Sequence, residues 1–288
     1  MRAVSVARKD FRDAIQSRAL WTLVVVFVLL LAITTYAYVE VPEMFGPTAD
    51  ATFGGLLFFT TGITGLFIPL AALVVCYKSL AGERELGSIK ILLSLPLTRS
   101  DAFFGKVLGR SGVLGVGTIV GLVVSLGFGA ALLGSIDVVP LVVFVLLTLA
   151  FAGVYSAIMV GLSASTGSTS RATTLAVGFF VLFELGWDAV PIAVVYVVEG
   201  FSLPAEFPDW VFLVTQLSPS TAYFTSIIAL LPDTAAELGT TVGGNGVSVE
   251  PTEAEPFYVT PEVGLVVLAL WLVVALAVGH SRFGRSDL

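Results

Sequence analysis

Long apolar runs separated by shorter polar segments dominate the chain. The apolar runs cover residues 20–39, 55–77, 107–133, 140–163, 173–198 and 262–280. Each run is long enough, as an α-helix, to cross a hydrocarbon core of ~30 Å, which takes about 20 residues. The pattern therefore predicts an all-α, polytopic membrane protein with six transmembrane helices.

The composition supports this class of protein. Hydrophobic residues make up 57% of the chain and charged residues only 12%, which lies outside the range of soluble domains. The first apolar run follows a basic segment, as the apolar region of a secretory signal does. It is too long for a signal and no small-residue cleavage site follows it. We therefore expect the first run to remain part of the protein.

The distribution of basic residues predicts the orientation in the membrane. Lysine and arginine in short loops are retained on the cytoplasmic side. The predicted loops at 40–54, 134–139 and 199–261 contain acidic residues but no lysine or arginine. Every basic residue falls near the two termini or around the second and fourth connections. We therefore expect a multi-pass protein of the cell (plasma) membrane with a cytoplasmic N-terminus and a cytoplasmic C-terminus.

Residues 1–19 are predicted to form a cytoplasmic amphipathic helix, and residues 20–288 a six-span transmembrane domain. The apolar positions of the first segment are Val4, Ala7, Phe11 and Ile15. They recur at helical spacing while basic residues occupy the other faces, which is typical of a helix on an anionic membrane surface. The alternative interpretation is a frayed cytoplasmic tail.

Small residues recur every four positions along the third run. They are Gly117, Gly121, Ser125 and Gly129. A stripe of small residues lets two helices approach closely in lipid. The stripe could serve packing within one protomer or contact with a second copy, and the sequence favours packing within the protomer.

Two acidic residues lie inside the fifth run, in the stretch "FELGWDAVP". Glu184 and Asp188 are four positions apart, so they would share one face of a regular helix. An ionised carboxylate near the bilayer centre costs roughly 2.5–3.5 kcal/mol on the insertion scale, so both should face protein, water or each other. A polar contact inside the bundle and a role in transport or gating are both open.

The segment 199–261 is predicted to form a long exterior loop containing re-entrant or interfacial helices. Its apolar pieces, near 208–217 and 221–231, are each too short to cross a bilayer. Trp210 and Tyr223 are expected near the lipid headgroups, where aromatic residues gather.

The stretch from 78 to 106 is a dense charged run on the predicted cytoplasmic side. Upstream of Pro96, two helical faces can be distinguished, which predicts one amphipathic helix over 83–95. The polar face consists of Glu83, Gly87, Lys90 and Ser94, and the apolar face of Leu86, Ile89, Leu92 and Leu93. Pro96 disfavours helix at the residue before it. The sequence "TRSD" from Thr98 to Asp101 has the pattern of a capping box at the start of the next helix.

The string "GERELGSIKILLSLPLTRSDAFFGK" resembles the cytoplasmic segment between the second and third spans of ABC-2 type transporter permeases. The resemblance extends over the chain through the basic N-terminus, the six spans and the long exterior connection before the last span. It implies that this segment is a coupling helix docking on a separate ATPase subunit. The implied docking residues are Glu83, Arg84, Glu85, Gly87, Ser88, Leu92, Leu93, Pro96 and Arg99.

The same resemblance implies a permease subunit of an ATP-driven exporter that is not itself an enzyme. The sequence lacks the GxxxxGK[ST] phosphate loop, so ATP and Mg are expected on the partner ATPase and no cofactor on this chain. A homodimer or heterodimer of permeases, bound by two ATPases and surrounded by membrane lipid, is the implied assembly. No nucleic-acid partner is expected.

Within the family, "SPSTAYFTSIIAL" and the adjoining loop resemble the NosY-like branch, which is associated with maturation of copper-dependent nitrous oxide reductase. This chain has one cysteine, one histidine and three methionines. These residues form no ligand cluster in the sequence, so no metal site is predicted.

Two other classes of protein compete with this interpretation. An ion- or proton-coupled secondary transporter could use Glu184 and Asp188. It would not account for the charged segment, and no repeat relates the two halves of the chain. A membrane-embedded enzyme is disfavoured because the sequence shows no recognisable pairing of nucleophile and base.

Overall fold

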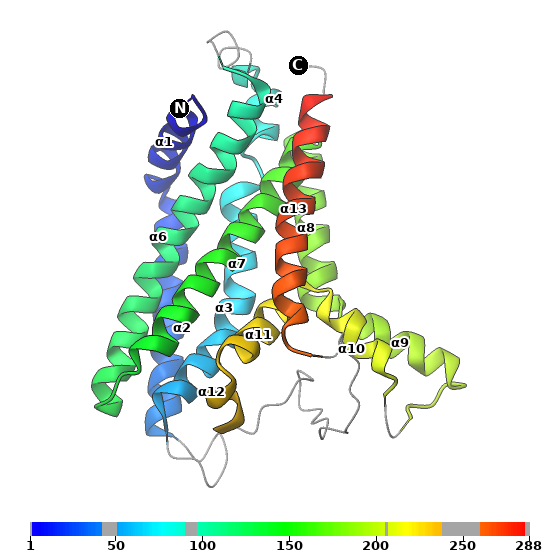
Figure 1. Ribbon diagram of the computed structural model, residues 1–288. Helices are drawn as coiled ribbons and strands as arrows, with labels where there is room; N and C mark the ends of the chain where they lie inside the picture. Colours follow the sequence, from blue (N-terminus) through cyan, green and yellow to red (C-terminus); the bar gives the residue numbers. More distant parts are fainter. Residues whose placement is uncertain (1, 42–50, 90–96, 205–206, 238–259, 286–288) are drawn as a thin grey trace.

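The computed structural model of the chain describes residues 2–41, 51–89, 97–204, 207–237 and 260–285. These residues form a bundle of helices, most of which run along one common direction (Figure 1). The N-terminal helix and the end of the last helix lie at the same end of the bundle (Figure 1). That end is called the terminal end below.

Five helices among the described residues are long and apolar enough to cross a membrane. They are α2 (Arg18–Glu40), α3 (Phe53–Cys76), α6 (Arg99–Leu133), α7 (Val138–Ala164) and α13 (Val263–Gly284). They confirm the corresponding predicted spans, with small differences at the ends. The exception is α6, whose 35 residues reach about 50 Å and so extend well beyond a ~30 Å core.

The fifth predicted span is bent. It comprises α8 (Thr169–Phe180), a π-helical turn η2 (Val181–Gly186) and α9 (Ala189–Val198). The two parts meet at an angle of 60°, and α9 turns away from the bundle beside α10 (Figure 1). The pair counts as a sixth span when both parts are taken together, and the apolar run at 173–198 is therefore a bent span rather than one regular helix.

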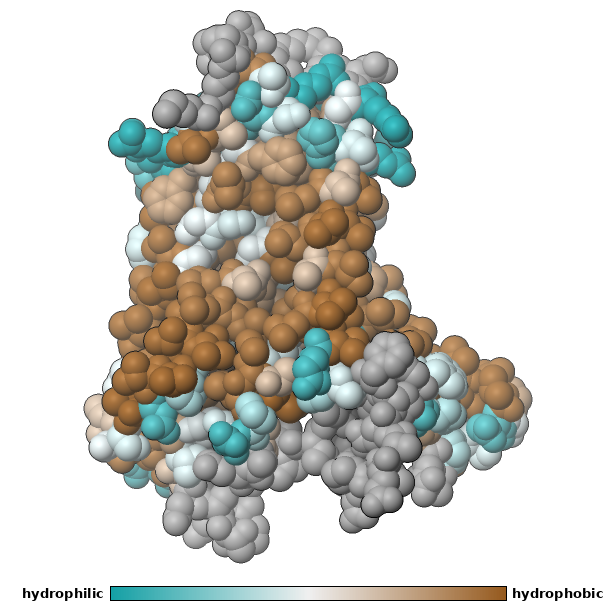
Figure 2. Space-filling view, in the orientation of Figure 1, coloured by the Kyte–Doolittle hydropathy of each residue, from teal (hydrophilic) through white to brown (hydrophobic). Residues whose placement is uncertain are grey.

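An apolar belt crosses the middle of the molecule on the face shown in Figure 2. Figure 2 shows hydrophobic residues across the central part of one face and hydrophilic residues gathered at the terminal end. Large apolar side chains such as Val123, Leu146 and Val273 are more than 60% exposed. A surface of this kind is unsuited to water and fits the hydrocarbon of a bilayer.

The small-residue stripe on α6 packs against α2 of the same protomer. A Cβ atom added at Gly121 would lie 2.3 Å from Cδ1 of Phe27, which is buried. One step further along, the hydroxyls of Ser125 and Thr35 are 2.9 Å apart. Close backbone approach therefore brings α2 onto α6, and the preference for packing within the protomer is confirmed.

The first helix, α1 (Arg2–Ile15), packs against the first turns of α6. Its buried edge consists of Val6, Asp10 and Ala14, whereas Val4 is 63% exposed. An added Cβ at Gly105 would lie 2.6 Å from Cβ of Val6, so glycine permits the close contact. The predicted helix is present, but the predicted apolar stripe beginning at Val4 is not its buried edge. The structure gives α1 a protein partner that hydrophobic spacing alone did not reveal.

Three short helices follow the bent span: α10 (Asp209–Gln216), α11 (Pro219–Leu230) and α12 (Pro232–Glu237). The first two coincide with the short apolar pieces of the sequence. Tyr223 on α11 is fully buried, and its hydroxyl lies 2.7 Å from Thr148 Oγ1 and 3.1 Å from Thr64 Oγ1. The expectation that Tyr223 lies near the headgroups was wrong, because this hydroxyl finds its partners inside the bundle. Trp210 is 39% exposed.

Candidate coupling site

The charged motif lies on a short helix, α4 (Ala81–Glu85), at the terminal end of the bundle (Figure 1). Gly87 follows with φ +72°, the left-handed conformation that commonly ends helices. The predicted continuous helix over 83–95 is therefore interrupted at Gly87. Leu86 and Ile89, expected on one apolar face, are separated by this break: Leu86 is 84% exposed and Ile89 is buried.

Part of the predicted docking segment lies outside the described residues. This part is 90–96 and includes Leu92, Leu93 and Pro96. Their roles stay predictions from the resemblance.

Glu83 belongs to an internal ion-pair network. Its Oε1 atom lies 2.8 Å from Nζ of Lys106 on α6, and the same ammonium lies 2.9 Å from Oδ1 of Asp10 on α1. Arg110 pairs with the other carboxylate oxygen of Asp10, at 2.8 Å. Lys106 and Asp10 are both buried. Because buried charges need close partners, this network fixes α1, α4 and α6 relative to one another.

The next two residues of the motif reach different helices. Nη1 of Arg84 donates to the carbonyl of Ala164, the last residue of α7, at 3.3 Å. The backbone N–H of Thr169, the first residue of α8, donates to Oε2 of Glu85 at 2.6 Å. A cation at a helix C-terminus and an anion at an N-terminus both have the favourable sign for the helix dipole.

The remaining described motif residues also make structural contacts. Ser88 Oγ donates to the carbonyl of Glu83 at 3.3 Å, across the end of α4. Nη1 of Arg99 donates to the carbonyl of Gly284 at 2.8 Å, which ties the start of α6 to the end of α13. Thr98 and Asp101 form the predicted capping box, with both reciprocal hydrogen bonds present.

The geometry changes the interpretation of the motif. Its three consecutive ionised side chains contact α6, α7 and α8, and the network through Lys106 adds α1. The sequence did not lead us to Asp10, Lys106 and Arg110 as members of the ion-pair network. Their positions do hint at it: Lys106 and Arg110 are four residues apart and so share a helix face, and Asp10 is an acid within a basic segment that could pair with them.

Glu184 occupies a second polar site, within the bundle. Its carboxylate accepts a hydrogen bond from the hydroxyl of Tyr155 on α7. Ser220 Oγ, near the start of α11, lies 2.6 Å from Oε2 of Glu184 and 3.1 Å from the carbonyl of Gly65 on α3. The carboxylate therefore joins the bent span to α7 and α11, with protein rather than lipid around its oxygens.

The bend beside Glu184 is held by hydrogen bonds to its backbone and to Trp187. Ser218 Oγ donates to the carbonyl of Phe183 at 3.1 Å, and Trp187 Nε1 donates to the carbonyl of Val214 at 2.7 Å. Asp188 lies just after the π-helical turn and is exposed. The regular helix face that Glu184 and Asp188 were expected to share is therefore absent.

Together the fold, the apolar belt and the charged motif define a multi-pass helical membrane protein whose connecting helix α4 is bound to several helix ends. A family model described as "ABC-2 family transporter protein" matches residues 4–288. The chain belongs to this family of ABC transporter permeases.

Two relatives have the same printed name, "Probable ABC transporter permease protein NosY". The protein from Pseudomonas aeruginosa is 28% identical over 295 residues, covering 99% of this chain and 98% of its own length. The protein from Stutzerimonas stutzeri is 30% identical over 230 residues, covering 76% of this chain and 78% of its own length.

Proposed function

We propose that the chain is the transmembrane permease subunit of an ATP-driven exporter in the cell membrane, with both termini cytoplasmic. Membership of the ABC-2 family supports the transporter assignment. The absence of a phosphate loop from the sequence supports a separate ATPase subunit that holds ATP and Mg. The basic residues near both termini and around α4 support the cytoplasmic placement of the terminal end.

The observation that carries the proposal is the attachment of α4 to the membrane helices. Glu83, Arg84 and Glu85 each bond to a different one of α6, α7 and α8. Packed protein interiors have low compressibility and transmit displacement. An ATPase that moves α4 would therefore move the ends of several helices at once, which is what coupling requires.

Leu86 supplies an apolar contact for that partner. It follows the motif directly and is 84% exposed at the polar end of the molecule. Exposed apolar side chains that enter a partner's pocket usually contribute most to affinity, while charges at the rim set orientation. We assign Leu86 as an anchor for the ATPase, beside the predicted contacts Leu92 and Leu93.

The test is co-purification of the permease with its cognate ATPase, combined with substrate-stimulated ATP hydrolysis. Leu86→Asp is expected to reduce both, with expression and thermal stability unchanged. The matched control is Ile136→Asp, at an apolar residue that is 51% exposed in the connection after α6, away from the terminal end. Full ATPase binding and full coupling in Leu86→Asp would refute docking through this segment.

The bent span supports a paired permease. Within the protomer α8 buries only Ala172 and Ala176 among its own residues, and Leu185 of η2 is 64% exposed. An apolar face of this kind suits either lipid or a second permease subunit. Two permeases with two ATPases form the proposed working assembly, and cross-linking at Leu185→Cys in a Cys76→Ser background tests the pairing.

A second candidate function is ion- or proton-coupled secondary transport. It is favoured by the Glu184 carboxylate, which lies within the bundle between two hydroxyl groups. Reconstituted transport separates the two functions. The ABC assignment requires ATP and the partner ATPase, whereas secondary transport would continue without either and would stop when the ion gradient is collapsed.

A further inference from the structure

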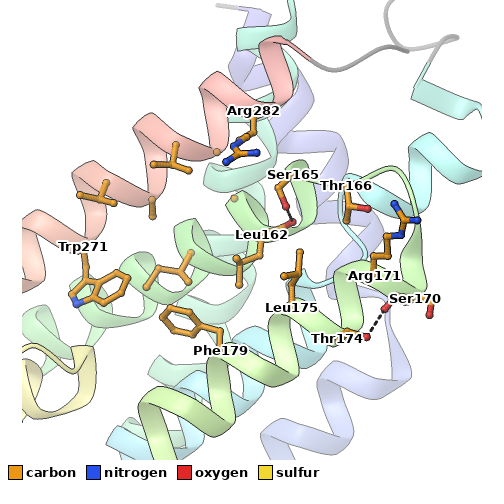
Figure 3. Close-up of a pocket in the computed structure, with 16 residues that line it drawn as sticks. Leu162, Ser165, Thr166, Ser170, Arg171, Thr174, Leu175, Phe179, Trp271 and Arg282 are labelled. Carbon is orange, nitrogen blue, oxygen red and sulfur yellow. Dashed lines mark hydrogen bonds between the residues drawn. The ribbon is translucent and has the colours of Figure 1, made fainter. Parts of the chain in front are cut away.

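A groove of about 730 Å³ opens between α7, α8 and α13 towards the terminal end. Figure 3 shows its charged residues, Arg171 and Arg282, on opposite sides, with Ser165 and Thr166 between them. Trp271 and Phe179 lie at the other end of the groove (Figure 3). The groove therefore has a cationic mouth and an aromatic inner end.

The two arginines at the mouth are available to a ligand. Both are exposed, and neither has an ion-pair or hydrogen-bond partner for its guanidinium within the described ranges 2–41, 51–89, 97–204, 207–237 and 260–285. Ser165 Oγ donates to the carbonyl of Leu162 at 2.7 Å, so its hydrogen is already used. Thr166 Oγ1 accepts the backbone N–H of Ser168 at 3.2 Å, which leaves the hydrogen of its own hydroxyl for a ligand. Two guanidinium groups beside the Thr166 hydroxyl form a phosphate-binding set of donors.

The inner part of the groove is apolar. Leu162, Leu175, Phe179 and Val274 contribute to its walls. At its base α7 and α13 approach closely, because a Cβ atom added at Gly279 would lie 2.7 Å from Cα of Gly161. The two glycines place no side chain where the helices cross. The groove therefore extends along the helices with apolar walls.

We propose that this groove binds one anionic phospholipid, with its phosphate between Arg171 and Arg282 and an acyl chain along the apolar walls towards Trp271. The basic mouth lies at the end of the bundle where lysine and arginine gather, and the apolar walls belong in large part to the candidate membrane spans α7 and α13. Basic pockets between membrane helices recognise anionic lipid headgroups. The basic mouth matches the phosphate and the apolar walls match an acyl chain, so the groove fits both parts of the lipid.

Other occupants match only part of the groove. A free anion would use the arginines but leave the apolar walls open. A second copy of the permease would need an acidic partner for the arginines. The exposed π-helical surface at Leu182 and Leu185 is not among the groove residues, so pairing of two permeases there would leave the lipid in place.

The test uses the full-length chain purified in a neutral detergent and titrated with phosphatidylglycerol or phosphatidylcholine, with native mass spectrometry as the readout. Phosphatidylglycerol is expected to bind more tightly. Arg171→Gln combined with Arg282→Gln should weaken that binding at least about tenfold, because both contacts to the phosphate are charge-assisted. The matched control is Arg285→Gln, which removes a charge from the same helix end but outside the groove.

A second pair of variants tests the apolar part without changing any charge. Val274→Trp fills the wall of the groove, whereas Val273→Trp places the same side chain on the neighbouring exposed position outside it. Only Val274→Trp should reduce lipid binding, and the thermal stability of both variants reports whether each folds.

Four results would overturn the proposal. The first is equal binding of the two lipids. The second is an equal loss of binding in Arg285→Gln and in the double variant. The third is efficient cross-linking between two copies through Leu175→Cys, which would make the groove a subunit interface. Competition by inorganic phosphate without any effect of Val274→Trp would identify a simple anion site and would also contradict the lipid assignment.

Discussion

The ammonium of Lys106 lies 2.8 Å from Oε1 of Glu83, which binds the first ionised residue of the charged motif to α6. Lys106→Met should destabilise the protein by about 1–3 kcal/mol, less than for a fully buried ion pair, since it removes the partner of Glu83, whose side chain is 29% exposed. Asp10 retains Arg110 as a partner, so the loss should come mainly from Glu83. Thermal unfolding in detergent measures the effect.

The double variant Lys106→Met with Glu83→Gln is the control for that prediction. It removes both charges and should recover part of the lost stability, giving a favourable coupling energy in a double-mutant cycle. Additive effects of the two substitutions would contradict the ion pair. Glu83→Lys is a related variant at the same ion pair. Beside Lys106 it places two like charges together, so a loss of stability is expected in addition to weaker docking.

The close contact between α2 and α6 makes a prediction about two glycines on one helix. Gly121→Ala should destabilise the protein by about 1–3 kcal/mol, because the new Cβ would lie 2.3 Å from a ring atom of Phe27. Gly127→Ala meets nothing within 4 Å and should be neutral or slightly stabilising through helix propensity. Equal unfolding temperatures for the two variants would show that the helices do not approach as described.

The site at Glu184 predicts different outcomes for two substitutions. Glu184→Gln keeps the shape and one acceptor oxygen for Tyr155, while its NH2 group can donate to Ser220 Oγ, whose own hydrogen can go to the carbonyl of Gly65; stability and ATP-driven transport should therefore be close to those of the parent protein. Glu184→Leu leaves the buried Tyr155 hydroxyl without this acceptor, at a cost of about 1–3 kcal/mol, whereas Ser220 keeps the carbonyl of Gly65. Loss of transport in a stable Glu184→Gln protein would instead indicate that its charge is required.

The helices could be predicted from the sequence where hydrophobic length alone determines them. Five runs correspond to α2, α3, α6, α7 and α13, because a long apolar stretch has few alternatives to a spanning helix. The capping box at Thr98 was also predicted, since its geometry depends on local residues.

Features that depend on tertiary contacts could not be predicted in the same way. The bend after Gly186 is accompanied by bonds from Ser218 to Phe183 and from Trp187 to Val214, which are far apart in sequence. The break in the docking segment could not be predicted from hydrophobic spacing either. The spacing predicted one helix, whereas the left-handed conformation at Gly87 interrupts it and separates Leu86 from Ile89. Glycine permits this conformation, but the spacing of apolar residues does not report it.

The proposed orientation is tested by single cysteines in a Cys76→Ser background. An impermeant thiol reagent should label Ser135→Cys in intact cells, because the connection after α6 is assigned to the outside. Ser281→Cys, exposed near the end of α13, should be labelled only after permeabilisation. The reverse pattern would invert the topology and remove the terminal end from the side of the ATPase.

The segment containing α4 is proposed to contact the ATPase. A photo-cross-linking amino acid at Leu86, introduced into membranes that contain the cognate ATPase, measures this contact. A cross-linked product of permease and ATPase is expected from position 86, with a yield that changes when ATP is added, and none is expected from position 136 in the connection after α6. The absence of a product from position 86, with the complex intact, would refute docking through α4.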